Sequence, residues 1–425
     1  NSTHGKCLSA GCPDDWELLE LIPIPKPAMN FLMRLPILSA VLLSSAGLAI
    51  AEPGAELLAK WLKRFPEADS NRDGVLSVEE ALQFRDQLTR KNPGAGGAPR
   101  EFQVDPGWNA NAFPEHAVCY RTPEEIKELH GGEVTSFPKP ENGALRIVGT
   151  GHSFMAPGYR TLPDICEADG FSQPLLTHTG GGITGSARYK WEQENGIFQF
   201  DGKPEPKLLS SIANAEWDAM MWGPYFNDRP EYYECWIEFC LKYQPEMKFY
   251  LSDAWPQLLQ LDEFPETEAA FSAEIIARLG EEMNTIYGEV IKALNEKYSD
   301  RVFIMPTSDA MVLAAERWHR GELPGVDGLH RSIGGKERSL WRDTLGHLGP
   351  GFDRLEGYVF YSTLYGKSPE LIEGPIQFGR SGKNKKAPNF PGEALDQVFR
   401  EIAWQAVIGN PLSGVKDENG DGLGD

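Results

Sequence analysis

Basic side chains are in short supply in this sequence of 425 residues. Lysine and arginine number 41 against 62 aspartates and glutamates, so the formal net charge is −21. A chain this acidic is not expected to bind nucleic acid or an anionic membrane surface through its overall charge. The lysine-rich run at residues 383–386 is interpreted as a solvated loop. We therefore expect no nucleic-acid partner.

Long hydrophobic runs are also rare, and the one at residues 35–50 indicates the compartment. Arg34 precedes it, and Ala49-Ile50-Ala51 ends it with the pattern of a signal-peptidase site. The run is short for a spanning helix, and no charged stop-transfer segment follows. We predict a signal peptide at 29–51, a secreted or periplasmic mature chain, and no membrane association after cleavage. Residues 1–28 are interpreted as a non-native or upstream extension.

Cysteines are few, and four of the six follow the predicted leader: Cys119, Cys166, Cys235 and Cys240. An exported chain permits disulfides. Cys235 and Cys240 lie five residues apart in a helical pattern, which separates them by roughly 140° and about 7.5 Å of rise. A bridge would exceed the normal reach, so we expect two packed thiols there. Pairing of Cys119 with Cys166 stays open.

A calcium-loop pattern follows the leader, between helical runs expected at 55–65 and 81–90. Oxygen-bearing side chains stand at positions one, three, five, nine and twelve of a twelve-residue loop, and position seven supplies its carbonyl. These six are Asp69, Asn71, Asp73, Ser77, Glu80 and, for the carbonyl, Val75. Alternating hard ligands, Gly74 at the sharp turn and a closing carboxylate are what Ca²⁺ coordination requires. Residues 52–90 resemble the EF-hand family, and we expect one structural Ca²⁺ there.

A second, shorter pattern of this kind lies in the expected tail at 411–425. Asp417, Asn419 and Asp421 occupy positions one, three and five of a similar loop, but the sequence ends before position twelve. Two interpretations stay open, a calcium-binding loop and a polar tail.

Residues 91–142 are interpreted as a linker and an irregular region, because prolines and glycines are frequent there. From residue 143 to 410, short apolar runs alternate with amphipathic stretches, the clearest helix being expected at 268–297. Strands are expected at 145–148, 174–179, 217–222, 248–251 and 302–305. This alternation predicts an α/β domain with a parallel sheet covered on both faces.

Ser153 stands just after the first expected strand, which is predicted to end at a Gly-Thr-Gly turn at 149–151. A serine at a strand-to-helix turn has an exposed hydroxyl beside the first amides of the helix, as a nucleophile in acyl transfer requires. Such a serine needs a histidine base and an orienting carboxylate. His347 with Asp343, and His330 with Asp327, are the two candidate pairs in loops after the last expected strand.

The order of these blocks over roughly 143–370 resembles the SGNH (GDSL-like) hydrolase superfamily. The resemblance implies a flavodoxin-like three-layer α/β/α fold, with Ser153 as nucleophile, His347 as base and Asp343 as its orienter. It also implies that Gly181 and Asn227 help the amide of Ser153 to bind the oxyanion. The blocks depart from the family pattern: His152 replaces an aspartate, two extra residues precede Asn227, and one extra residue separates Asp343 from His347.

The leading hypothesis is a secreted serine esterase that hydrolyses small acyl esters, including acetyl groups on carbohydrate. The alternative is a non-catalytic, calcium-dependent extracellular binding protein on the same fold. A hydrolase with a metal at its catalytic centre fits poorly, because no His/carboxylate cluster accompanies Ser153 in the sequence.

Overall fold

The structure is a computed structural model in which the chain forms two compact units, Asn1–Gln103 and Val104–Asp425. It describes residues 58–59, 62–63, 66–77, 80, 122–129, 131–179, 189, 199–200, 203–204, 208–224, 229–378 and 390–425. The predicted leader, the second helix expected at 81–90 and the linker up to 121 lie outside these residues. In the first unit the structure describes the 3-10 helix η2 (Pro66–Ala68) and most of the loop that follows it.

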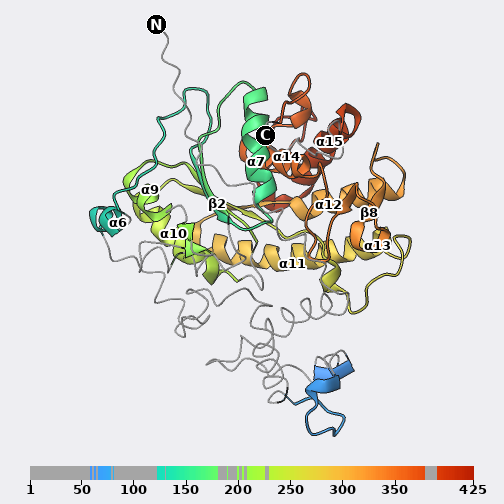
Figure 1. Cartoon of the computed structure of the whole chain (residues 1–425). Coiled ribbons are helices and arrows are strands. Elements are labelled where there is room, and N and C mark those ends of the chain that lie inside the picture. Colours follow the sequence, from blue (N-terminus) through green and yellow to red (C-terminus); the bar gives the residue numbers. More distant parts are fainter. Residues whose placement is uncertain are drawn as a thin grey trace. The chain divides into compact units, whose positions relative to one another are not determined.

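The second unit is built on a parallel sheet of five strands in the order β2-β1-β5-β6-β7 (Figure 1). The strands are β1 (Ile147–Gly151), β2 (Leu175–Thr179), β5 (Ala219–Trp222), β6 (Lys248–Ser252) and β7 (Val302–Met305). All four neighbouring pairs run parallel. The central strands β1 and β5 are buried along their whole length, as strands covered on both faces must be. The predicted α/β class is confirmed.

Strand β1 extends further than the sequence suggested, because the expected strand was to stop at Gly149. The structure continues it to Gly151. A Cβ on Gly149 would lie 2.8 Å from Tyr159 Cζ, and one on Gly151 would lie 2.8 Å from Met155 Cγ. The two glycines therefore serve close packing on the sheet and do not form a turn.

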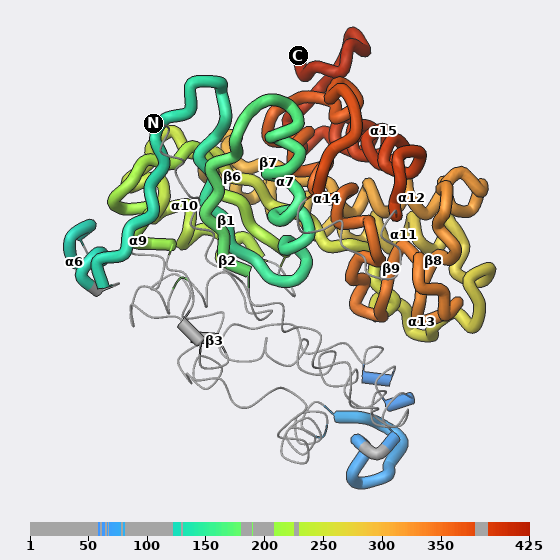
Figure 2. The backbone as a smooth tube through the Cα atoms, turned by 45° about the horizontal axis from the view of Figure 1, so that its top comes forward, coloured from blue at the N-terminus to red at the C-terminus, as the bar shows by residue number. Residues whose placement is uncertain are grey.

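Helices cover both faces of the sheet (Figures 1 and 2). On one side α7 (Ala156–Ala168) packs against α14 (Asp353–Tyr365), which in turn packs against α15 (Glu393–Gly409). On the other side lie α9 (Leu208–Asn214), α10 (Glu231–Tyr243) and α11 (Ala273–Tyr298). Helix α12 (Thr307–His319) contacts both α11 and α15.

Smaller elements complete this unit. They are α6 (Pro123–Leu129), α13 (Arg331–Gly334), the antiparallel pair β3 (Gln199–Phe200) and β4 (Lys203–Pro204), the parallel pair β8 (Gly328–His330) and β9 (Ser339–Trp341), and the 3-10 helices η5 (Leu258–Gln260), η6 (Pro369–Leu371) and η7 (Pro411–Ser413). Helix α11 begins later than the expected residue 268, because the Ser272 hydroxyl caps it by accepting from Ile275 N.

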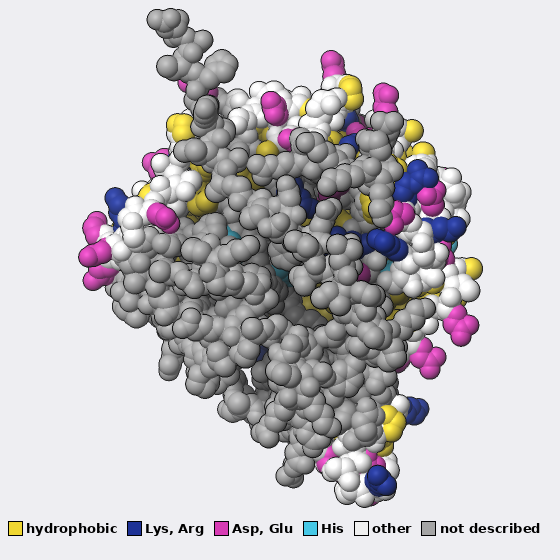
Figure 3. Space-filling model, in the orientation of Figure 1, with side chains coloured by type: hydrophobic (Ala, Val, Ile, Leu, Met, Phe, Trp, Pro, Cys, Tyr) yellow, Lys and Arg dark blue, Asp and Glu magenta, His cyan; other side chains and the backbone are white. Residues whose placement is uncertain are grey.

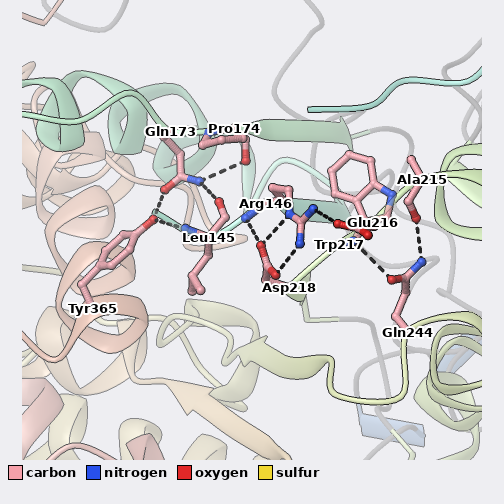
Figure 4. A network of polar contacts seen from close by, with 10 residues as sticks. All are labelled: Leu145, Arg146, Gln173, Pro174, Ala215, Glu216, Trp217, Asp218, Gln244 and Tyr365. Carbon is pink, nitrogen blue, oxygen red and sulfur yellow. Dashed lines mark hydrogen bonds and ion pairs between the residues drawn. The ribbon is translucent and has the colours of Figure 1, made fainter. Parts of the chain in front are cut away.

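Ion pairs and amide hydrogen bonds hold the amino-terminal edge of the sheet (Figure 4). The buried Arg146, just before β1, donates from Nε and Nη2 to Asp218 and from Nη1 to Glu216. The hydrogen bonds from Arg146 lower the pKa of Asp218. Gln173 Nε2 donates to the carbonyls of Leu145 and Pro174. The starts of β1, β2 and β5 are thus tied together at the edge opposite Ser153.

The cysteines of this unit agree with the geometric argument. Cys235 and Cys240 are free and buried in α10, so the expected packed thiols are confirmed. Cys166 is also a buried free thiol, and it donates to Gln173 Oε1 at 3.6 Å. The bridge considered for Cys166 is therefore not formed; Cys119 lies outside the described residues.

Charge on the described surface is mixed. On the face in Figure 3, acidic and basic side chains of the described residues stand interspersed. Among the helices that the structure describes, none has the length and apolar content to cross a membrane.

Candidate functional site

The site lies where the order of the sheet reverses. The chain passes from β1 outwards to β2 and then returns to the other side of β1 to form β5. In open α/β sheets, ligands bind at such a switch point, outside the carboxyl ends of the strands. Ser153 stands two residues after the end of β1, so this crevice is the candidate functional site.

Ser153 is held in a tight turn between β1 and α7. The carbonyl of His152 accepts from Met155 N and Ala156 N, which starts the helix directly after the serine. The side chain of His152 also connects β1 to β5, because its Nε2 is hydrogen-bonded to the carbonyl of Pro224. Ser153 itself is exposed, as a hydroxyl that meets a ligand must be.

His347 reaches the same place from a hairpin that follows β9. Arg342 N donates to His347 O at 2.9 Å, and Trp341 pairs with Leu348 in an antiparallel bridge. The extra residue between Asp343 and His347 is accommodated within this hairpin. Gly346 N donates to Asp343 O at 3.0 Å, and Gly346 takes a φ of 85°, which a glycine adopts without strain.

The structure brings Ser153, His347 and Asp343 into one hydrogen-bonded line. Ser153 Oγ lies 2.7 Å from His347 Nε2. His347 Nδ1 lies 2.9 Å from Asp343 Oδ2 and 3.0 Å from Oδ1. A carboxylate only accepts, so Nδ1 carries the proton and Nε2 accepts from the serine hydroxyl.

The carboxylate of Asp343 is held in its ionised form. Leu345 N and His347 N donate to its Oδ1 at 3.1 and 3.3 Å. Burial raises its pKa, but the hydrogen bonds and electrostatic interaction with His347, together with the charge of Arg342, outweigh that effect, and the pKa of Asp343 is lowered. The group that orients the imidazole therefore stays negative at neutral pH.

Two helices hold the serine and the histidine in fixed relation. Helix α7 begins just after Ser153, α14 begins soon after His347, and the two pack closely through Gly158 and Gly357. Gly158 N donates to Glu356 Oε2 at 2.6 Å, and Thr161 Oγ1 donates to Asp353 O at 3.0 Å. Hydrogen bonds between the helices thus connect the two loops of the site.

The alternative pair, Asp327 with His330, is not brought together. The Asp327 carboxylate accepts from Arg338 Nε and Nη2 at 2.7 and 2.9 Å. His330 lies in strand β8, not in a loop as expected, and is 1% exposed. Its Nδ1 accepts from Ser332 N at 3.2 Å, and burial lowers its pKa to about 4.

Two further expected residues, Gly181 and Asn227, lie outside the described residues. Within the described part of the site, the backbone amide of Ser153 stays the candidate donor for binding an oxyanion. His178 is buried at the end of β2, which fits a structural role.

The loop at 69–80 is closed by its own side chains. Asp69 Oδ2 accepts from Gly74 N at 2.9 Å, and Glu80 accepts from the backbone amides of Ser70, Asn71 and Ser77. The hydrogen bonds from Ser77 are the main reason that the pKa of Glu80 is lowered to about 2.

Three hydrogen bonds of the first loop recur at the same positions of the tail loop. The carboxylate at position one accepts from the amide at six, the residue at three from the amide at five, and the residue at five from the amide at seven. In the first loop these acceptors are Asp69, Asn71 and Asp73, with Val75 N as the last donor; in the tail they are Asp417, Asn419 and Asp421, with Leu423 N.

The two loops differ in what surrounds position one. Asp69 is 9% exposed, and its buried Oδ1 has no hydrogen-bond partner, whereas Asp417 Oδ2 also accepts from Trp404 Nε1 at 3.1 Å. Among the described residues, no group of three or more His, Cys, Asp or Glu side chains converges as a metal site.

Comparisons with known proteins place the chain in no family. No family model matches the sequence, and no curated protein matches it. A crystal structure of a DUF4886 family protein from Bacteroides uniformis is similar, with a TM-score of 0.41 and 13% sequence identity. The match covers 61% of this chain and 93% of that chain. A likeness of this size identifies no family.

Proposed function

We propose that the chain is a secreted serine ester hydrolase whose nucleophile is Ser153, on an SGNH-like domain at 143–410. The observation that carries the proposal is the line of contacts from Ser153 Oγ to His347 Nε2 and from His347 Nδ1 to Asp343 at the switch point of the sheet. A base within 2.7 Å of a hydroxyl, itself oriented by an ionised carboxylate, supports nucleophilic catalysis by that hydroxyl.

The residues have the following roles in the proposed reaction. Ser153 Oγ attacks the acyl carbon while His347 Nε2 takes its proton, and the Ser153 amide donates to the oxyanion. His347 then gives the proton to the leaving alcohol, which leaves an acyl-enzyme. Water attacks this ester with His347 as base, and the acid departs as Oγ regains its proton. Asp343 stays ionised and stabilises the imidazolium throughout.

The substrate class we propose is small acyl esters, including acetyl groups on carbohydrate. It is tested by the turnover of acetyl, butyryl and octanoyl nitrophenyl esters and of acetylated xylan. We expect activity to fall with acyl length and acetate to be released from the polysaccharide. Equal turnover of octanoyl and acetyl esters would contradict the short-acyl assignment.

Two matched substitutions separate the candidate bases. We expect His347→Ala to lower kcat by several orders of magnitude and His330→Ala to lower it little, provided that both variants fold. Collapse in the second variant with near-wild-type turnover in the first would transfer the role to His330. If the wild-type chain neither hydrolyses esters nor reacts at Ser153, the non-catalytic binding alternative replaces the esterase.

We further propose that residues 52–90 form an EF-hand-like segment that binds one structural Ca²⁺. The ligand set is hard oxygen, which suits Ca²⁺, and the buried, unpartnered Oδ1 of Asp69 is an oxygen left for a cation. Asp69, Asn71, Asp73, Ser77 and Glu80 would hold the ion with the carbonyl of Val75. The tail residues Asp417, Asn419 and Asp421 are the second candidate loop.

Calorimetric titration of the full chain with Ca²⁺ tests both loops, with Asp69→Ala and Asp417→Ala as a matched pair. For an extracellular structural site we expect a Kd of about 10⁻⁴ to 10⁻³ M that is lost in Asp69→Ala. A heat signal that persists in Asp69→Ala and disappears in Asp417→Ala would place the ion in the tail loop instead.

A further inference from the structure

Phe154 follows Ser153 directly and places its ring against the imidazole of His347. The two ring centroids lie 5.1 Å apart with their planes at 88°. Phe154 also stacks on Trp255, with the centroids 4.4 Å apart and the planes at 27°. Phe154 is 8% exposed and Trp255 is 1% exposed, so the phenyl ring has little room to move.

The loop that carries Trp255 also contacts the hairpin of His347. A Cβ on Gly346 would lie 2.8 Å from Pro256 O, so the two backbones approach closely there. The loop follows β6 and is anchored to the start of α12, because Asp253 Oδ1 accepts from Thr307 Oγ1 and Ser308 N at 2.8 and 2.7 Å. Phe154 is therefore wedged between a well-anchored loop and the imidazole.

Among the residues that the structure describes, three contacts restrain the His347 imidazole: two are hydrogen bonds, to Ser153 and Asp343, and one is the contact with the Phe154 ring. The hydrogen bond from Ser153 Oγ is lost whenever that oxygen carries an acyl group. The one hydrogen bond that His347 Nδ1 donates to Asp343 does not by itself prevent the imidazole ring from tilting. The contact with Phe154 takes part in no proton transfer and so persists through every step of the reaction.

We propose that Phe154, supported by Trp255, is a positioning residue that keeps the His347 imidazole aligned while it carries the proton from Ser153 to the leaving group. The inference rests on the proposed esterase function. Small displacements of a catalytic group lower the rate steeply, so a restraint of this kind affects turnover more than stability.

The choice of leaving group separates a positioning role from a purely structural one, because a purely structural role would not change the relative rates on alkyl and aryl esters. A nitrophenolate leaves without a proton, whereas an alkoxide depends on proton delivery by His347. Removing the restraint on the imidazole should therefore harm the hydrolysis of an alkyl ester more than that of an aryl ester with the same acyl group. General acid catalysis typically contributes about 10² to 10⁴-fold, so partial misalignment leaves a measurable difference.

The experiment measures kcat/KM of the full chain for ethyl acetate and nitrophenyl acetate. The variants are Phe154→Leu, Phe154→Met as a second choice that keeps more volume, and Phe239→Leu as the control. Phe239 is buried in α10, on the other side of the sheet, and packs on Tyr243 with ring centroids 5.1 Å apart. Urea unfolding establishes that each variant is folded.

We expect the Phe154 variants to lose about tenfold or more on ethyl acetate and less than about threefold on nitrophenyl acetate, and the control to lose equally on both. An unchanged ratio of the two substrates in both Phe154 variants would overturn the positioning role while the esterase proposal stands. A wild-type chain that hydrolyses neither ester would overturn the proposed function and this inference with it.

Discussion

Substitution of Gly357 by alanine tests whether the packing of α7 on α14 fixes the site. A Cβ at this position would lie 2.8 Å from Thr161 Cβ and 2.9 Å from Ile165 Cδ1, and it would also contact Thr161 Oγ1. Ordinary van der Waals contact begins at 3.4 Å, so the helices must separate by at least 3.4 − 2.8 = 0.6 Å. If that shift reached the site in full, the Ser153–His347 distance would grow from 2.7 to about 3.3 Å.

The expected cost is larger in activity than in stability. Overpacking of this kind costs about 1–3 kcal/mol, partly offset by about 1 kcal/mol from the better helix propensity of alanine. A displacement approaching 1 Å in a catalytic pair costs up to about 100-fold in rate. We therefore expect Gly357→Ala to remain folded and to lose at least about tenfold in kcat/KM on nitrophenyl acetate.

Gly280→Ala is the matched control for this substitution. Its Cβ would lie 2.6 Å from Val312 Cγ2, which produces a comparable clash between α11 and α12. Urea unfolding and nitrophenyl acetate hydrolysis are measured on both variants. Full activity in a folded Gly357→Ala, or equal losses of activity in the two variants, would refute the idea that α7–α14 packing sets the geometry of the site.

The buried His330, the charge of Asp343 and the calcium-loop segment provide three further tests. The pKa of His330 is about 4 in the folded chain and about 6.5 in the unfolded chain, so its contribution to the free energy of unfolding is present above pH 6.5 and is lost as pH falls towards 4. In urea unfolding across this range, His330→Asn should remove up to about 3 kcal/mol of the pH dependence of the free energy of unfolding, and an unchanged pH dependence would contradict this prediction. Asp343→Asn should lower kcat by about 10⁴-fold with little effect on KM, because the imidazole loses its orienting charge; a loss below tenfold in steady-state assays would argue against that role. Chelation of Ca²⁺ should leave the turnover of nitrophenyl acetate unchanged while the hydrolase domain stays folded, and loss of activity under those conditions would disprove an independent calcium segment.

Much of the fold was predictable because each strand of the sheet contains a short apolar run. The strand expected at 302–305 coincides with β7, and those expected at 174–179 and 248–251 differ from β2 and β6 by one residue at one end. The prediction for β1 was wrong at both ends, because a strand was expected at 145–148 and β1 spans Ile147–Gly151. Its end was missed because a single sequence does not distinguish a glycine that permits close packing from one that forms a turn.

For the candidate site, the sequence predicted three residues that the structure brings together, but it did not predict the contacts that hold them. The order of Ser153, Asp343 and His347 along the chain was a usable signal, and the structure brings the three together. The hairpin that accommodates the extra residue depends on a bridge between Trp341 and Leu348. The position of the Phe154 ring depends on its stacking against Trp255, in a loop about a hundred residues away in the sequence. Such contacts between distant segments leave no periodic pattern.

Modification of the native chain by a fluorophosphonate probe tests the central claim most directly. The reagent phosphonylates a serine only when a neighbouring base activates its hydroxyl, so mass spectrometry of the digested protein reads the contact between Ser153 and His347 chemically. We predict one phosphonyl group per chain, located on Ser153, and none in Ser153→Ala or in His347→Ala. Labelling at another serine, or labelling that persists in Ser153→Ala, would contradict the account.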